Sequence, residues 1–88
     1  MHFVYIIRNS ANKLYVGVTK DLQARLRSHN DKRGAQFTKR IPTFETVFLE
    51  QYATLADARK REIQIKKWRR DKKEVLIKRY QTGLPTRQ

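Results

Sequence analysis

The sequence predicts a small α+β protein whose elements follow in the order strand, strand, helix, strand, helix, helix. Three observations lead to this prediction. Two short segments rich in β-branched and aromatic residues, 3–7 and 14–18, flank a run of turn-forming residues. A segment with helical spacing follows them at once. A third strand-like segment, 43–51, then precedes two further helical segments, 55–68 and 71–80.

The first two strands are expected to pair as an antiparallel β-hairpin. Residues 9–12, Asn-Ser-Ala-Asn, have turn chemistry and leave a connection of about four to six residues. Successive side chains of a strand point to opposite faces, and in the first strand both alternating sets are apolar or aromatic. This strand should therefore be the central one, covered on both faces.

The first helix begins soon after the hairpin. Thr19 is its expected N-cap, and Asp21 suits its first turn. The helix should run from residue 21 to about residue 30 and end at the Asp-Lys-Arg-Gly sequence of residues 31–34. At about 100° per residue, four side chains fall on one side of this helix: Leu22, Arg25, Leu26 and His29.

Two more helices are expected after the third strand. Thr54 and Asp57 resemble a capping box at the start of the helix 55–68, with Asp in place of the usual Glu. The helix 71–80 should stop at the Thr-Gly pair that follows it, with Pro85 beyond.

Composition limits the kind of protein this can be. At 88 residues, of which 39% are hydrophobic, the chain suits one domain with a modest core. We assign residues 1–80 to that domain and residues 81–88 to a C-terminal tail. The absence of cysteine excludes disulfides and thiolate metal sites. No apolar run approaches the roughly 20 residues of a membrane helix, and the N-terminus lacks a signal-peptide pattern. We therefore expect a cytoplasmic location, with association with the nucleoid as an option.

The strongest compositional feature is charge. Twenty-one Lys and Arg residues against eight Asp and Glu residues leave a net charge of +13. Self-repulsion on this scale opposes folding, whereas a polyanion would relieve it and counterion release would favour binding. Nucleic acid, most of all DNA, is therefore the expected partner, in preference to an anionic membrane surface. The alternative is a soluble basic protein with no such partner.

The C-terminal helical region carries the densest positive charge. Residues 59–79 hold eleven Lys and Arg residues and three acids. This density of one sign favours a surface that contacts phosphates over an ordinary solvated helix face. Trp68 lies within this span, where it would either stack on a base or fill the junction between the two helices. The expected nucleic-acid-binding residues are Lys66, Lys67, Arg69, Arg70, Lys72 and Lys73.

Glu62 interrupts an apolar stripe. On the wheel of the helix 55–68 it lies with Leu55, Ala58 and Ile65 within about 80°. A carboxylate that faces inward needs a cation, a metal ion or hydrogen bonds. Glu62 therefore either pairs with a Lys or Arg at the edge of the stripe or has a special role.

Arg25 and His29 are four residues apart and so are neighbours on the first helix. An arginine in this position could bind a phosphate through two hydrogen bonds, and a histidine could move a proton near neutral pH. Repulsion between two positive charges favours a neutral His29 unless an anion is bound. The alternative is a solvated basic face with an incidental histidine.

Tyr5 and Tyr15 each lie in one strand of the predicted hairpin. A buried tyrosine is usually a packing residue whose hydroxyl finds a hydrogen bond. The functional interpretation requires adjacent cations that stabilise the phenolate, which Arg25 and a metal ion on Glu62 would supply. The two tyrosines, Arg25, His29 and Glu62 together make a set suited to cleaving phosphodiesters.

Motifs along most of the chain, from about residue 3 to residue 77, resemble those of one known family. Residues 3–5 (Phe-Val-Tyr) keep the tyrosine of its first motif, and residues 15–17 (Tyr-Val-Gly) match its second with Val for Ile. Residues 17–30, 34–38 and 62–68 resemble its following helix, a loop and its metal-binding helix. The chain thus resembles the GIY-YIG nuclease superfamily, in particular its small stand-alone bacterial members of uncharacterised function.

This resemblance implies a small three-stranded antiparallel sheet flanked by helices, and DNA-strand cleavage with one divalent metal ion. Glu62 would bind the ion, Mg²⁺ or Mn²⁺. Tyr15 or Tyr5 would act as general base toward an attacking water and the other would orient it; members of the family differ on which. Arg25 would neutralise the charge that develops on the phosphorane, and His29 would help to activate the base or the water.

The chain departs from the family pattern in two places. Phe3 and Val4 replace the Gly and Ile of the first motif, and no Asn follows Asn30, although many catalytic members carry one late in the domain. Gly17 is retained, which would let the backbone come close to the site. No second domain is expected, so specificity should come from nucleic-acid structure or from a protein partner.

Two hypotheses follow for the function. The first is a metal-dependent DNA endonuclease or nickase, with branched or damaged DNA as candidate substrates and DNA repair as the setting. The second is a non-catalytic, basic nucleic-acid-binding accessory protein with a degenerate nuclease site.

Overall fold

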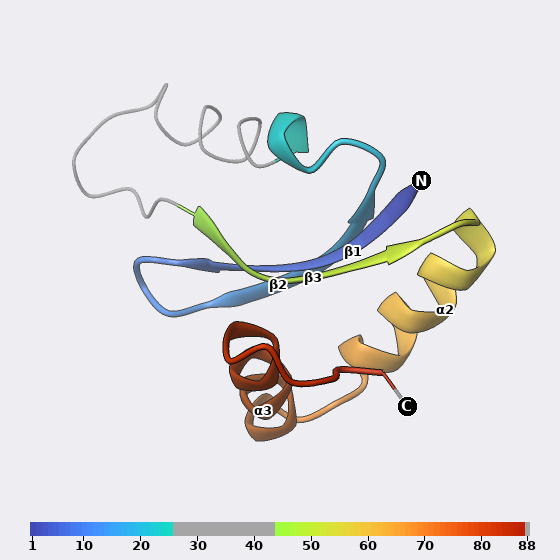
Figure 1. Ribbon diagram of the computed structural model, residues 1–88. Helices are drawn as coiled ribbons and strands as arrows, with labels where there is room; N and C mark the ends of the chain where they lie inside the picture. Colours follow the sequence, from blue (N-terminus) through green and yellow to red (C-terminus); the bar gives the residue numbers. More distant parts are fainter. Residues whose placement is uncertain (26–43, 88) are drawn as a thin grey trace.

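The computed structural model describes residues 1–25 and 44–87. Its strands form one antiparallel sheet in the order β2-β1-β3, with helical segments on both faces (Figure 1). The predicted α+β class is confirmed. The elements are β1 (His2–Asn9), β2 (Leu14–Thr19), β3 (Phe44–Tyr52), α2 (Leu55–Lys66) and α3 (Arg70–Gln81). Residues 22–25 are also helical and lie on the face of the sheet opposite α2 and α3.

The central position of β1 is as predicted. It pairs with β2 on one side and with β3 on the other. Val4 and Ile6 belong to the main core cluster beneath α2 and α3 and are fully buried. Tyr5 and Ile7 belong to a second cluster on the other face, with 3% and 1% exposure. Alternation along one strand therefore supplies both layers of the core.

A β-bulge in β3 thickens the main core. The partner of Ile6 is Phe48 but that of Ile7 is Thr46, so Val47 is an extra residue opposite β1. As a result the consecutive residues Val47 and Phe48 both join the cluster beneath the helices. The bulge thus lets β3 place two large side chains on one face where strict alternation would allow one.

The helices cover the sheet through short apolar stripes. Ala58 and Ile65 of α2 and Leu76 and Ile77 of α3 are buried in the main cluster. Leu55, which the helical wheel placed in the same stripe, is instead 45% exposed. It is the first residue of α2, at the end of the stripe.

The helix caps confirm one prediction and correct another. The Thr54 hydroxyl accepts the Asp57 backbone N–H at 3.2 Å, as expected of the α2 N-cap. The first helix, however, is capped by Asp21, whose carboxylate accepts the Ala24 N–H at 3.1 Å. Thr19 lies two residues earlier, and its hydroxyl accepts the Asp21 N–H in a local turn. Asp21 is the N-cap because its carboxylate reaches the backbone N–H of Ala24, three residues later.

The element boundaries differ slightly from the predictions. The hairpin connection is the four residues between Asn9 and Leu14, within the expected length. α2 ends at Lys66, two residues before the predicted end, and α3 begins at Arg70, one residue before the predicted start. Leu26, His29 and the predicted helix break at residues 31–34 lie outside the described residues. Within the described part of the chain, no helix is long and apolar enough to cross a membrane.

A charged clasp joins α3 to the end of β1. Glu74 accepts two hydrogen bonds from the Arg8 guanidinium, at 2.6 and 3.0 Å, and one from Arg70 at 2.7 Å. Arg70 also donates to the backbone oxygen of Asn12 at 2.7 Å. The hydrogen bond from Arg8 is the largest cause that lowers the pKa of Glu74 from 4.5 to about 2, and the bond from Arg70 adds to it.

This clasp makes stability depend on pH. Because the pKa of Glu74 is lower in the folded state, its contribution is present above pH 4.5 and is lost as pH falls toward 2. We expect Glu74→Gln to lower the free energy of unfolding at pH 7 by about 0.5–1 kcal/mol, a modest value because the pair is partly exposed to solvent. The difference from wild type should vanish by about pH 2. Urea unfolding at a series of pH values measures it.

Asp71→Asn is the matched control, since it removes one acid from the same helix and Asp71 has no ion pair among the described residues. If the two substitutions lowered the free energy of unfolding equally at every pH, the role of the clasp would be contradicted.

Candidate active site

The phenol of Tyr5 occupies space that only a glycine opposite it leaves free. Tyr5 and Gly17 are cross-strand partners in the β1–β2 ladder, so they point to the same face. A Cβ placed on Gly17 would meet the Tyr5 hydroxyl and lie 2.6 Å from Cζ of the ring, far inside van der Waals contact. Gly17 thus allows the Tyr5 ring to lie across β2, which is a more specific role than the close backbone approach that the sequence suggested.

Arg25 reaches this phenol from the first helical turn after the hairpin. Asp21 caps the turn, and Leu22 packs against the cluster that contains Tyr5. From this position Arg25 Nε donates a hydrogen bond to the Tyr5 hydroxyl oxygen at 3.2 Å. The bond orients the guanidinium, and Arg25 has no ion pair among the described residues. Its other N–H groups are therefore able to bind an anion such as a phosphate.

Tyr15 lies on the same face of the sheet as Tyr5. Its partner across the ladder is Ile7, two residues along β1 from Tyr5. The ring of Tyr15 packs edge-on against Phe44, with centroids 5.3 Å apart. Tyr15 is half-buried, whereas Tyr5 is almost completely buried. Its hydroxyl makes no hydrogen bond to any described residue, so it is the more accessible of the two phenols.

Glu62 lies on α2, which packs on the other face of the sheet and also contacts β2, the strand that carries Tyr15. It shares the inward stripe of α2 with Ala58 and Ile65, and its side chain is 8% exposed. One carboxylate oxygen accepts from Arg59 at 3.3 Å and the other is 3.0 Å from Lys66 Nζ. The inward orientation of Glu62 is as predicted. Its partners are basic side chains at the edge of the stripe, which was the alternative to a special role.

The donor set at Glu62 suits a hard divalent cation held by one carboxylate. The described residues contain no group of three or more acids or histidines that could enclose a metal ion. Mg²⁺ usually keeps several waters and uses one or two carboxylates together with substrate phosphates. Arg59 and Lys66 are more than half exposed, so their long side chains can move aside. Glu62 therefore fits the protein ligand of such an ion.

The predicted site residues fall into two groups. Tyr5, Tyr15, Gly17 and Arg25 come together on one face. Glu62 belongs to α2, and Figure 1 shows α2 on the other face of the sheet. His29 lies outside the described residues. The roles assigned to all of these residues stay predictions.

The six expected nucleic-acid-binding residues also divide. Lys66 and Arg70 form ion pairs with Glu62 and Glu74. The other four have no carboxylate partner in the described part of the chain and carry uncompensated charge: Lys67, Arg69, Lys72 and Lys73.

A buried ion pair beside α2 was not predicted. Glu50 of β3 accepts two hydrogen bonds from Arg61, at 2.9 and 3.2 Å, and their side chains are 2% and 12% exposed. The Tyr52 hydroxyl and the Thr86 hydroxyl donate to the same carboxylate at 2.8 and 2.7 Å. Burial, and then the Glu50 carboxylate, raise the pKa of Tyr52. The signal in the sequence was an acid two residues after Phe48, on the same face of the strand.

Comparison with known proteins identifies relatives along most of the chain. The family model described as the GIY-YIG catalytic domain matches residues 1–75. UPF0213 proteins of Staphylococcus aureus strains Mu3 and N315 are each 46% identical over 77 residues, which cover 88% of this chain and 94% of theirs. The solution NMR structure of a UPF0213 protein from Bacillus halodurans matches with a TM-score of 0.58 and 30% identity, over 88% of this chain and 82% of that one.

The contact between Tyr5 and Gly17 predicts the effect of adding one methyl group. Gly17→Ala should lower the free energy of unfolding by about 1–3 kcal/mol, because the new Cβ collides with the Tyr5 ring. Urea unfolding measures this loss. In a Tyr5→Ala background the same substitution should cost much less, since the ring is gone. An equal cost in both backgrounds would show that the ring is not the reason for the glycine.

Proposed function

This chain belongs to the GIY-YIG family, and on that premise we propose that it is a divalent-metal-dependent endonuclease that hydrolyses DNA phosphodiesters. The observation that carries the proposal is the hydrogen bond from Arg25 to Tyr5, on a face that Tyr15 shares. It supports a phosphate-binding guanidinium held beside two phenols. The net charge of +13 supports a polyanionic substrate.

In this proposal Tyr15 takes the proton and Tyr5 positions the arginine. A general base must reach the attacking water. Tyr15 is more exposed than Tyr5, and its hydroxyl makes no hydrogen bond to any described residue. Acting as a phenolate, Tyr15 accepts the proton of the water. The water oxygen bonds to phosphorus as the bond from phosphorus to the leaving deoxyribose oxygen breaks, and that oxygen takes a proton from solvent. Arg25 stabilises the charge on the non-bridging oxygens.

Glu62 would hold the divalent ion, Mg²⁺ or Mn²⁺, which when bound supplies Lewis-acid polarisation of the phosphate. One site per chain would nick one strand. Branched or damaged DNA is the proposed substrate class, with specificity taken from the shape of the nucleic acid or from a protein partner.

A second candidate function is non-catalytic binding of nucleic acid. The observation in its favour is that both carboxylate oxygens of Glu62 are already engaged by Arg59 and Lys66. An ion at Glu62 would have to displace these cations. This candidate predicts salt-sensitive binding that survives the loss of Tyr15 and Glu62.

A cleavage assay at low salt with Mg²⁺ or Mn²⁺ distinguishes the two functions. Its substrates are supercoiled plasmid, forked DNA, flap DNA and single-stranded RNA. Glu62→Gln keeps the size of the side chain and should abolish cleavage while nucleic-acid binding persists. Intact substrates with wild-type protein, or equal cleavage by Glu62→Gln, would favour the binding protein.

The two tyrosines should differ in their kinetic effects. We expect Tyr15→Phe to lower kcat by about 10²–10⁴-fold, as for loss of a general base. Tyr5→Phe should lower kcat less, because it only releases Arg25. Single-turnover cleavage measures both effects. The reverse pattern would make Tyr5 the base.

Arg25→Gln should lower kcat by about 10²–10³-fold with a small change in substrate binding, since its charge acts mainly on the transition state. Lys20→Gln, which removes an exposed charge five residues earlier in the chain, is the matched control. Equal effects of the two substitutions would mean that Arg25 contributes only to the general positive field.

A further inference from the structure

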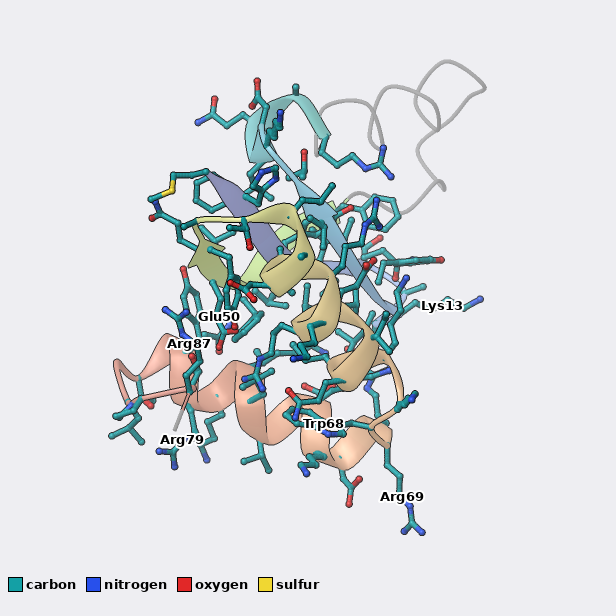
Figure 2. The ribbon with its side chains drawn as sticks, turned by 90° about the vertical axis from the view of Figure 1, so that its right-hand side faces the viewer. Lys13, Glu50, Trp68, Arg69, Arg79 and Arg87 are labelled. Atoms are coloured by element: carbon teal, nitrogen blue, oxygen red, sulfur yellow. The ribbon has the colours of Figure 1, made fainter. Side chains whose placement is uncertain are left out.

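A groove lies on the helical side of the molecule, away from the face that carries Tyr5 and Arg25. It has a volume of about 760 Å³, within the roughly 300–1,000 Å³ of small-ligand sites. The end of β3, α2, the start of α3 and the C-terminal segment all contribute to it. Figure 2 shows Trp68 at the junction of α2 and α3, with Glu50 and Arg87 farther along the same side. The lining residues are Tyr52, Asp57, Lys60, Arg61, Gln64, Trp68, Lys72, Thr86 and Arg87.

The buried ion pair described above builds the wall of this groove. Arg61 is fixed by Glu50, and its guanidinium also donates to the Thr86 backbone oxygen at 2.8 Å. The Thr86 hydroxyl binds Glu50 at 2.7 Å. The segment after α3 is therefore held against β3 and α2 by buried polar contacts, which makes the groove a defined part of the fold.

Two aromatic rings in the groove are each covered by a cation. Lys72 Nζ lies 4.3 Å and the Arg61 guanidinium 5.3 Å from the centre of the Trp68 ring, and the Arg87 guanidinium lies 4.8 Å from that of Tyr52. Neither Lys72 nor Arg87 has a carboxylate partner in the described part of the chain. A ligand with negative charge and a planar group would draw Lys72 or Arg87 off its ring onto the charge, and the planar group would take the place of the cation on the ring.

The charge of the groove selects an anion. Arg61 is neutralised by Glu50. Lys60, Lys72 and Arg87 then remain against one acid, Asp57. An acidic peptide would match this charge but would leave the rings unused. Single-stranded nucleic acid offers phosphates at regular spacing and unpaired bases that stack on aromatic rings. The bases of a duplex are stacked within the helix and cannot enter a recessed groove.

We propose that this groove binds an unpaired stretch of nucleic acid, with a base against Trp68 and phosphates on Lys60, Lys72 and Arg87. The groove and the face that carries Tyr5, Tyr15 and Arg25 lie on different sides of the sheet. A bound single strand would therefore be a separate part of the substrate from the bond that is cleaved, as the unpaired arm of a branched DNA is. The inference rests on the proposed function only in its choice of nucleic acid as ligand.

Trp68 is the sole tryptophan of the sequence, so its fluorescence reports on the groove directly. Twelve-nucleotide oligothymidylate, added at low salt in EDTA, should quench this emission to saturation. Lys60→Gln should weaken binding about fivefold and reduce the slope of log K against log salt by about 0.7. Lys13→Gln removes the same charge at a position that points away from the groove in Figure 2, and it should change binding less than about twofold.

Removal of the ring gives a second test. Trp68→Leu should weaken binding of a fluorescein-labelled oligothymidylate by about 5–150-fold, as expected for loss of one stacked base. Trp68 also packs against the main core, so this variant is checked for folding by circular dichroism. Should it fail to fold, the emission of the wild-type protein still decides.

Several outcomes would overturn the inference. The labelled strand could bind with no change in Trp68 emission, or Lys60→Gln and Lys13→Gln could weaken binding equally. If thymidine monophosphate quenched the Trp68 emission as strongly as oligothymidylate at equal phosphate concentration, the groove would be a mononucleotide site. Competition by a duplex as effective as that by the single strand would also contradict it. EDTA prevents metal-dependent cleavage, so binding and cleavage are measured separately. Strand binding without nuclease activity in Mg²⁺ or Mn²⁺ would support this inference and overturn the proposed function. Cleavage without quenching of Trp68 would support the proposed function and overturn this inference.

Discussion

Burial of β1 on both of its faces is the constraint on which the rest of this structure depends. Val4 and Ile6 enter the core beneath α2 and α3, while Tyr5 and Ile7 enter the layer on the opposite face. β1 also lies between β2 and β3, so both of its edges are paired as well. The face that carries Tyr5, Tyr15 and Arg25 and the aromatic groove consequently lie on opposite sides of one three-stranded sheet.

Electrostatics organises the surface around that sheet. Three acids among the described residues have paired carboxylates, each held by arginine or lysine from a neighbouring turn or element: Glu50 by Arg61, Glu62 by Arg59 and Lys66, and Glu74 by Arg8 and Arg70. With eight acids against twenty-one basic residues, most positive charge is left without such a partner. Folding thus satisfies its buried carboxylates and leaves a cationic exterior, which suits a polyanionic ligand.

Part of the candidate site could be predicted from sequence motifs alone. The tyrosine motifs and Arg25 were recognisable as a set, and the structure brings Tyr5, Gly17 and Arg25 into contact as members of it. The position of Glu62 on an inward stripe could be predicted from helical spacing alone. Its pairing with Arg59 and Lys66 could be anticipated only as an alternative, because several basic side chains lie within reach of that stripe in the sequence.

The sequence by itself determined the class of fold, the order of its elements, the central place of β1 and the basic character of the molecule. These follow from local periodicity, turn chemistry and composition, which act over a few residues or over the whole chain at once. Tertiary structure alone decided that Glu50 and Arg61 form a buried pair and that residue 86 joins it. It also decided that aromatic rings from β3 and from the α2–α3 junction share one groove. Such contacts join residues 11–36 positions apart, and local pattern does not encode which distant partner a side chain will meet.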